Sequence, residues 1–137
     1  MPGYLFRSRD GLTNFEAGPQ FFTPNMRHSA LLIRDEHLYV FFTNRGDEPE
    51  RIMLSTIELT NEWNEWAASE PIEVLRPEMD YEGADMPLEP SRGGYIDERV
   101  HQLRDPAIYQ EGDRAYLLYS VAGESGIAVA EIEFSDR

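Results

Sequence analysis

Hydrophobic residues along the chain fall in short runs separated by turn residues, a pattern that predicts strands rather than helices. The runs are rich in β-branched and aromatic residues, and no segment holds a sustained helical period. The best helical candidate, residues 59–68, has no apolar stripe and is followed by Pro71. The predicted strands are Tyr4–Arg7, Ser29–Arg34, Leu38–Thr43, Ile52–Leu59, Ile72–Leu75, Pro106–Gln110, Ala115–Val121 and Gly126–Phe134.

The same order of strands occurs twice in the sequence. Residues 29–43 match residues 105–120, which places Tyr39 on Tyr116. The strands that follow, 52–59 and 127–134, also align, so each copy is predicted to hold at least three antiparallel strands. Residues 5–15 also resemble residues 54–63 over a shorter length. Residues 1–20 therefore look like the last two strands of an earlier copy.

Repeated four-stranded antiparallel sheets with aromatic-rich middle strands are typical of β-propeller blades. The middle strands, 38–42 and 115–119, are apolar on both faces, as expected for a blade that lies between two neighbours. We therefore predict an all-β fold, a partial β-propeller of about two to two and a half blades. The alternative is a β-sandwich, whose strands more often alternate apolar and polar residues.

The predicted organisation is a single partial propeller module over residues 1–137. Its parts are the end of one blade (1–21), a complete blade (22–78), an inter-blade loop (79–99) and a partial blade (100–137).

Charge and composition limit the partners and the chemistry that the chain can have. The chain is acidic, with 26 Asp and Glu residues against 12 Lys and Arg residues and a net charge of −14. Nucleic acids and anionic membranes need a basic face, so we expect neither as a partner. There is no cysteine, which excludes disulfides, thiolate zinc sites and a cysteine nucleophile. The three histidines lack metal-ligand spacing, and we predict no metal and no cofactor.

Targeting signals are not evident in the sequence. The first residues contain no apolar core of a signal peptide, and no stretch is long enough to span a membrane. The sequence therefore does not determine the cellular compartment, and a cytoplasmic location is expected if the chain is complete.

Three segments resemble the five-bladed propeller glycoside hydrolases of families 32, 43 and 68. They are VHQLRDPAIY (100–109), YLLYS (116–120) and GIAVAEI (126–132). The resemblance is good over residues 103–132 and looser over residues 27–134. It implies a central funnel that binds sugar and is lined by the first strand of each blade.

The resemblance gives Asp105 a place in the sugar site. A charged residue at the start of an inner strand would point into the funnel, hold sugar hydroxyls and stabilise the positive charge at the anomeric carbon. Arg104 is expected beside it at the funnel mouth, in contact with water or substrate, where it would keep Asp105 ionised. The alternative is a surface ion pair at the end of a loop.

His28 holds the corresponding position in the preceding repeat. A neutral imidazole there could hydrogen-bond a sugar hydroxyl, although a loop histidine that caps a strand is an equally good interpretation. We predict that Arg27, His28, Arg92 and Arg104 bind the substrate, a carbohydrate.

The long loop 80–95 connects the two predicted inner strands and should border the same funnel. It carries four carboxylates, of which Glu82 is the first candidate for a general acid and Asp85 the second. A solvated acidic loop is the alternative. In the resembling enzymes the acid follows Arg-Asp-Pro on a later blade, so at least one of the two essential carboxylates has no clear candidate here.

These observations predict a glycosidase-like or carbohydrate-binding module, a fragment of a larger propeller enzyme. The alternative is a non-catalytic carbohydrate-binding or assembly module with the same fold, and whether the isolated chain is an enzyme stays open. Residues 8–15 resemble a degenerate Asp-box, a structural hairpin of sialidase-like propellers. Trp63 and Trp66 are expected to pack within the blade rather than to stack on sugar.

An incomplete ring of blades would leave apolar faces and strand edges uncovered. We therefore expect the chain to self-associate, most simply as a two-fold homodimer. The seam is expected at the strand 4–7 or after residue 134.

Overall fold

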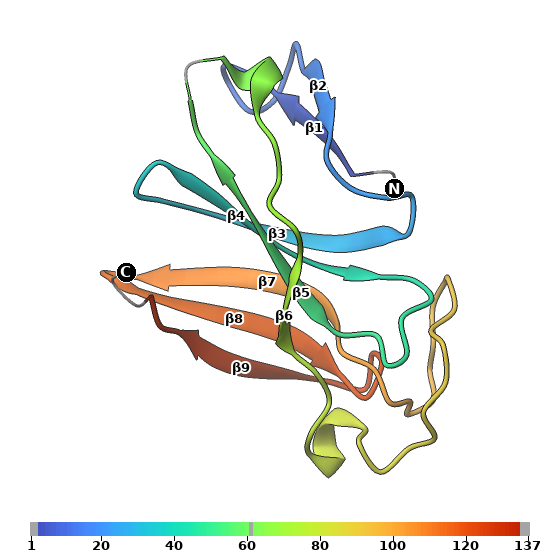
Figure 1. Cartoon of the computed structure of the whole chain (residues 1–137). Helices are drawn as coiled ribbons and strands as arrows, with labels where there is room; N and C mark the ends of the chain where they lie inside the picture. The colour runs from blue at the N-terminus through green and yellow to red at the C-terminus, as the bar shows by residue number, and fades with distance from the viewer. Residues whose placement is uncertain (1–2, 61, 135–137) are drawn as a thin grey trace.

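A computed structural model describes residues 3–60 and 62–134 of the chain, and these residues form an all-β structure (Figure 1). The strands are β1 (Tyr4–Arg7), β2 (Glu16–Gln20), β3 (Met26–Arg34), β4 (His37–Asn44), β5 (Ile52–Glu58), β6 (Ile72–Leu75), β7 (Arg104–Glu111), β8 (Arg114–Val121) and β9 (Gly126–Ile132). Two short 3₁₀ turns, η1 (Trp63–Glu65) and η2 (Asp80–Glu82), are the only helical elements in the described part. No helix there is long and apolar enough to cross a membrane.

The strands form three antiparallel sheets that follow the order of the chain. They are the hairpin β1–β2, the four-stranded sheet β3–β4–β5–β6 and the three-stranded sheet β7–β8–β9. None of the three closes on itself. In Figure 1 they lie one upon another, with the hairpin above the four-stranded sheet and the three-stranded sheet below it.

The two larger sheets repeat one another residue by residue over their first two strands. Tyr39 pairs with Leu32 of β3, and Tyr116 pairs with Tyr109 of β7. The same offset in residue number relates both pairs, so the predicted equivalence of Tyr39 and Tyr116 is confirmed. The repeat extends to irregularities, since the register of β3 shifts between Arg27 and Ala30 and that of β7 shifts between Arg104 and Ala107.

Two apolar clusters lie on opposite faces of the four-stranded sheet. One joins it to the three-stranded sheet, and its buried members are Ala30, Leu32, Phe41, Ile52, Leu103, Ala115, Leu117, Tyr119 and Val121. The other lies toward the N-terminal segment, where Phe21 and Phe22 pack on buried Met26, Leu38, Val40, Phe42 and Ile57. Each face of the four-stranded sheet therefore carries a buried apolar cluster, although Leu31 and Ile33 of β3 remain 55% and 67% exposed.

Equivalent residues of the two repeats point in the same direction along the stack. Leu38, Val40 and Phe42 of β4 face the N-terminal segment. Their equivalents in β8 are Ala115, Leu117 and Tyr119, which face the four-stranded sheet. The sheets are thus stacked head to tail, and like faces do not meet.

The predicted strands are present, with small shifts at their ends. Tyr4–Arg7 and Ile72–Leu75 match the structure. Residues 1–20 were expected to hold two strands, and the second is β2, whose range was not predicted because Glu16–Gln20 contains Gly18 and Pro19 and has no apolar run. Residues 135–137 of the predicted partial blade lie outside the described residues.

Trp63 packs within the stack, as predicted. A Cβ atom added to Gly18 of β2 would lie 2.3 Å from Cζ3 of Trp63, so the indole rests directly on the hairpin backbone. The guanidinium of Arg7 lies over the same ring, 3.8 Å from its centroid. Trp66 donates its indole N–H to the carbonyl of Thr60 at 3.0 Å and packs on the second cluster.

Candidate functional site

The site is built where the first strand of each repeat begins. His28 in β3 and Asp105 in β7 lie at equivalent bulges, and both have left-handed backbones with φ of 49° and 46°. This conformation costs roughly 1 kcal/mol or more in a residue other than glycine. The bulges break the strict alternation of side chains between the two faces of each sheet and direct both side chains into the space between β3 and β7.

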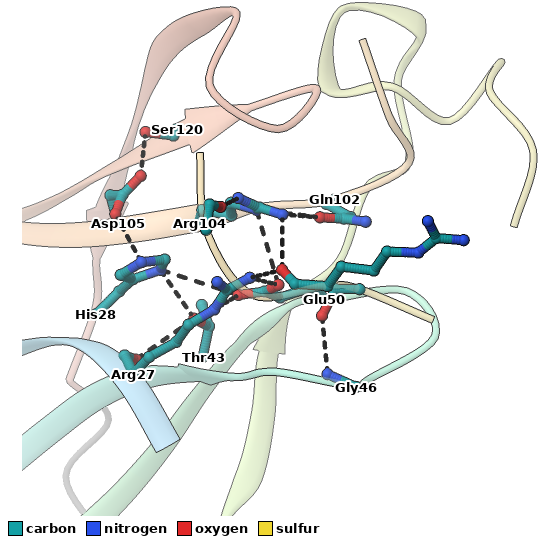
Figure 2. Close-up of polar contacts among 12 residues, drawn as sticks. Arg27, His28, Thr43, Gly46, Glu50, Gln102, Arg104, Asp105 and Ser120 are labelled. Atoms are coloured by element: carbon teal, nitrogen blue, oxygen red, sulfur yellow. Dashed lines mark hydrogen bonds and ion pairs between the residues drawn. The ribbon is translucent and has the colours of Figure 1, made fainter. Parts of the chain in front are cut away.

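The two side chains meet there (Figure 2). Nε2 of His28 lies 3.3 Å from Oδ1 of Asp105. Each is held by a hydroxyl from the neighbouring middle strand, since Oγ1 of Thr43 lies 3.3 Å from Nδ1 of His28 and Ser120 donates to Oδ2 of Asp105 at 3.1 Å. Thr43 and Ser120 are also equivalent positions of the repeat, so both halves of the contact are supported in the same way.

His28 is neutral near pH 7. Burial lowers its pKa below the ordinary value of 6.5, and the charge of Asp105, which raises the pKa, only partly offsets this effect. A carboxylate accepts hydrogen bonds, so the contact between Nε2 and Oδ1 of Asp105 favours the tautomer of His28 whose proton is on Nε2. Nδ1 is then the acceptor for the hydroxyl of Thr43.

A buried carboxylate lies beside this pair and joins the two repeats (Figure 2). Glu50, from the loop between β4 and β5, is fully buried. Arg27 donates to it through two nitrogens, with Nε 3.0 Å from Oε1 and Nη2 bound to Oε2. Nε of Arg104, the equivalent of Arg27 in the next repeat, lies 3.7 Å from Oε2. Leu103 also donates its backbone N–H to the carbonyl of Glu50 at 2.9 Å.

The expectation that Arg104 lies at a solvated funnel mouth is wrong. Its side chain is 1% exposed, and its donors are directed to Gln102 at 2.7 and 3.0 Å and to Glu124 at 2.9 Å. The alternative of a surface ion pair is wrong for the same reason. A guanidinium has five donors, and the acceptors Gln102, Glu124 and Glu50 lie within their reach, so Arg104 takes part in the support of the site.

Arg27 is likewise committed to buried partners. Its side chain is 14% exposed, and besides Glu50 it donates to the carbonyl of Arg92 at 3.2 Å. Arg92 is exposed and contributes that backbone oxygen. Binding of substrate by Arg27 and Arg92 stays a prediction.

The loop 80–95 borders the site through its second half. Ser91 accepts a hydrogen bond from the N–H of Gly46 at 2.9 Å, and the carbonyl of Gly94 accepts from Arg104 at 3.2 Å. This half of the loop therefore lies against the arginine–glutamate cluster.

The loop's candidate acids have structural partners. Glu82 is buried, accepts the N–H groups of Glu78 and Met79 at 2.9 and 3.1 Å, and accepts the hydroxyl of Tyr119 at 3.0 Å. Asp85 forms an ion pair with Arg99 at 2.9 Å. These contacts occupy both oxygens of Glu82, and a catalytic role for either residue stays a prediction.

The exposed polar atoms of the site are those of His28 and Asp105, whose side chains are 26% and 44% exposed. An apolar cavity of about 270 Å³ lies beside His28, and its lining includes Tyr4, Phe6, Phe21, Phe22, Met26 and Leu31. The site thus offers one partly exposed carboxylate, a neutral imidazole and nearby aromatic side chains. Among residues 3–60 and 62–134, no group of three or more His, Asp and Glu side chains could hold a metal ion.

Sequence reasoning missed Glu50 and Gln102. Glu50 stands among Asp, Pro and Arg in what reads as a solvated turn. The available signal was the repeat itself, since an arginine precedes the bulge residue in both copies, and two equivalent arginines at one interface require a shared anion.

Comparison with known proteins gives a relative but no family. The uncharacterized protein R118 of Acanthamoeba polyphaga mimivirus is 43% identical to this chain over 146 residues, which cover 95% of this chain and 41% of the mimivirus protein. The chain therefore spans less than half the length of that relative. No family model matches the chain, and no solved structure matches it.

Proposed function

We propose that this chain is part of a larger glycoside hydrolase-like β-propeller and that His28 and Asp105 lie in its carbohydrate site. The observation that carries the proposal is the 3.3 Å contact between these two residues, which begin the inner strands of two successive repeats. In a propeller, this position faces the central funnel of every blade.

Head-to-tail stacking supports the propeller over a sandwich. A two-layer sandwich buries one face of each sheet, whereas the four-stranded sheet carries a buried apolar cluster on each of its faces. Blades arranged around an axis present their equivalent faces in the same rotational sense, which agrees with the directions of Leu38 and Ala115. The chain also spans 41% of the mimivirus protein, about the share that two blades take of a five-bladed ring.

The chemistry of the site suits a neutral polyhydroxylated ligand. Asp105 accepts hydrogen bonds, His28 offers a ring edge without charge near pH 7, and Ser120 adds a hydroxyl. The net charge of −14 disfavours an anionic ligand. Aromatic side chains beside His28 could receive the C–H face of a sugar ring.

Binding without cleavage is the second candidate for the isolated chain. Glycoside hydrolysis commonly uses two carboxylates that flank the bond. Asp105 is 44% exposed at this site, whereas Glu50 is buried between Arg27 and Arg104. A complete pair then requires either a loop carboxylate, Glu82 first and Asp85 second, or a residue from another blade of the larger protein.

The test is a calorimetric titration of the chain with arabinofuranosyl and fructofuranosyl oligosaccharides. Asp105→Asn is expected to weaken binding at least about tenfold, because hydrogen bonds to a charged group contribute about 1.5–3 kcal/mol. Asp113→Asn, in the exposed turn between β7 and β8, is the matched control and should bind as the unaltered chain does. Equal losses in both variants, or no binding by the unaltered chain, would contradict the proposal.

A further inference from the structure

The outer face of the three-stranded sheet is apolar and exposed. Tyr109, Ile127 and Val129 are 54%, 76% and 62% exposed, respectively. The strand register arranges this face in two rows of directly opposed residues, which are Ala107–Leu118–Val129 and Tyr109–Tyr116–Glu131.

The repeat shows what covers such a face. The equivalent rows of the four-stranded sheet are Ala30–Phe41–Leu54 and Leu32–Tyr39–Thr56. There Leu32 is 3% and Phe41 is 1% exposed, and Ile52, the equivalent of Ile127, is fully buried. The cover is the next sheet in the chain, through Ala115, Leu117 and Tyr119 of β8.

We propose that the outer face of β7–β9 docks a further antiparallel sheet of the same repeat, carried by a longer form of this polypeptide. Its middle strand would present small and large apolar residues in alternation, as β8 does. The inference rests on the larger propeller proposed above. It is consistent with the mimivirus relative, of which this chain spans 41%.

A carboxylate at the edge of this face supports the same occupant. Glu50, in the loop between the second and third strands of its sheet, binds Arg27 of its own sheet and lies 3.7 Å from Arg104 of the next. Glu124 stands in the corresponding loop, binds Arg104 of its own sheet and remains 28% exposed. The next sheet should therefore begin its first strand with an arginine that reaches Glu124.

The residue after that arginine would enter the site. Arg27 precedes His28, and Arg104 precedes Asp105, at the two bulges. A third bulge residue would lie beside Asp105 as Asp105 lies beside His28. The docked sheet would therefore supply the next side chain of the carbohydrate site.

A second copy of this chain cannot provide the same cover. The face that corresponds to the inner face of β8 contains Leu38, Val40 and Phe42, and the chain's own Phe21 and Phe22 already pack on it. A second copy could offer only its own outer face. Self-association of the 137-residue chain as a two-fold homodimer through that face is accordingly what we expect when the further sheet is missing.

The test compares Val129→Lys in the 137-residue chain and in the polypeptide of the complete reading frame. In the short chain, sedimentation should show self-association at micromolar concentration that the substitution reduces. The midpoint of thermal unfolding, measured at a concentration too low for association, should change by no more than about 1 °C. In the complete polypeptide, the same substitution buries a charge between sheets and should lower the midpoint by at least about 5 °C. Ile33→Lys, at a 67% exposed apolar position of β3, is the control that should change neither.

Three results would overturn the inference. They are a reading frame that closes at the codon for residue 137, a short chain that stays monomeric and binds no hydrophobic dye, and a complete polypeptide whose stability Val129→Lys leaves intact. The readouts involve no sugar, so the docking face and the carbohydrate site can fail independently.

Discussion

His28 and Asp105 occupy the same position in two successive sheets, and their side chains are in contact, with Nε2 and Oδ1 3.3 Å apart. The repeat of one structural unit thus places two different chemical groups side by side. One is a neutral base that burial keeps uncharged, and the other is an exposed carboxylate. The supporting hydroxyls, Thr43 and Ser120, are duplicated with them.

The lowered pKa of His28 predicts a dependence of stability on pH. Between the pKa of the folded state and the unfolded value of 6.5, the unfolded chain binds a proton that the folded protein does not. The free energy of unfolding should therefore fall as the pH drops below about 6.5 and level off, for this group, below the folded pKa. Denaturant unfolding between about pH 5 and 8 should show a steeper fall in the unaltered protein than in His28→Asn.

An NMR titration of the His28 ring gives a second check. Asp105 raises the pKa of His28, so Asp105→Asn should lower that pKa further. A rise in the pKa of His28 in this variant would contradict the assigned contact.

Glu50→Gln should strongly destabilise the fold. The substitution leaves Arg27 and the 1% exposed Arg104 without their shared buried anion. Removal of one partner from a buried ion pair costs about 3–5 kcal/mol, and chemical denaturation measures this loss. Glu48→Gln, at an exposed position in the same loop, should change the free energy of unfolding by no more than about 0.5 kcal/mol.

Tyr119→Phe should cost about 1–2 kcal/mol of stability, because it removes the only side-chain donor seen on Oε1 of Glu82 in the described part of the chain. Burial raises the pKa of Tyr119, so its phenol should remain protonated in the folded protein at pH 11, which absorbance near 295 nm can follow. The matched control is Tyr109→Phe on the exposed outer face. If both variants unfold at the same denaturant concentration, the Tyr119–Glu82 hydrogen bond contributes nothing.

Gly83→Ala and Gly94→Ala form a matched pair. Both glycines have left-handed backbones, with φ of 92° and 94°, so alanine meets a similar backbone cost at each. At Gly83 the added Cβ would lie 2.2 Å from the carbonyl oxygen of Val100, whereas nothing lies within 4 Å at Gly94. Gly83→Ala should therefore lose at least about 2 kcal/mol more in unfolding free energy than Gly94→Ala. Similar losses would show that the loop can shift to accept the methyl group.

The strands and the repeat could be predicted from the sequence because both depend on local patterns. Middle strands such as 38–42 are apolar throughout and bounded by turn residues. The offset that joins Tyr39 to Tyr116 also relates His28 to Asp105, so the candidate pair could be found without coordinates.

The surroundings of the pair could not be predicted in the same way. Charged residues at the start of β7 suggest solvent, yet Arg104 is buried because the neighbouring Gln102 and two carboxylates from other parts of the chain, Glu50 and Glu124, converge on it. Burial of a charge depends on partners that only the tertiary structure brings together. The same holds for Glu82, whose acidic loop reads as solvated but folds onto Tyr119.

Glu50 has a consequence for how the molecule unfolds. It belongs to the loop of one sheet, yet its carboxylate and its carbonyl both reach the start of the next sheet, at Arg104 and Leu103. Separating the two sheets would leave a buried charge without its partner, so neither sheet is expected to unfold alone. Amide hydrogens of β4 and β8 should accordingly exchange in a single cooperative event, which makes this pair of repeats one folding unit, unlike arrays whose repeats fray one at a time from the end.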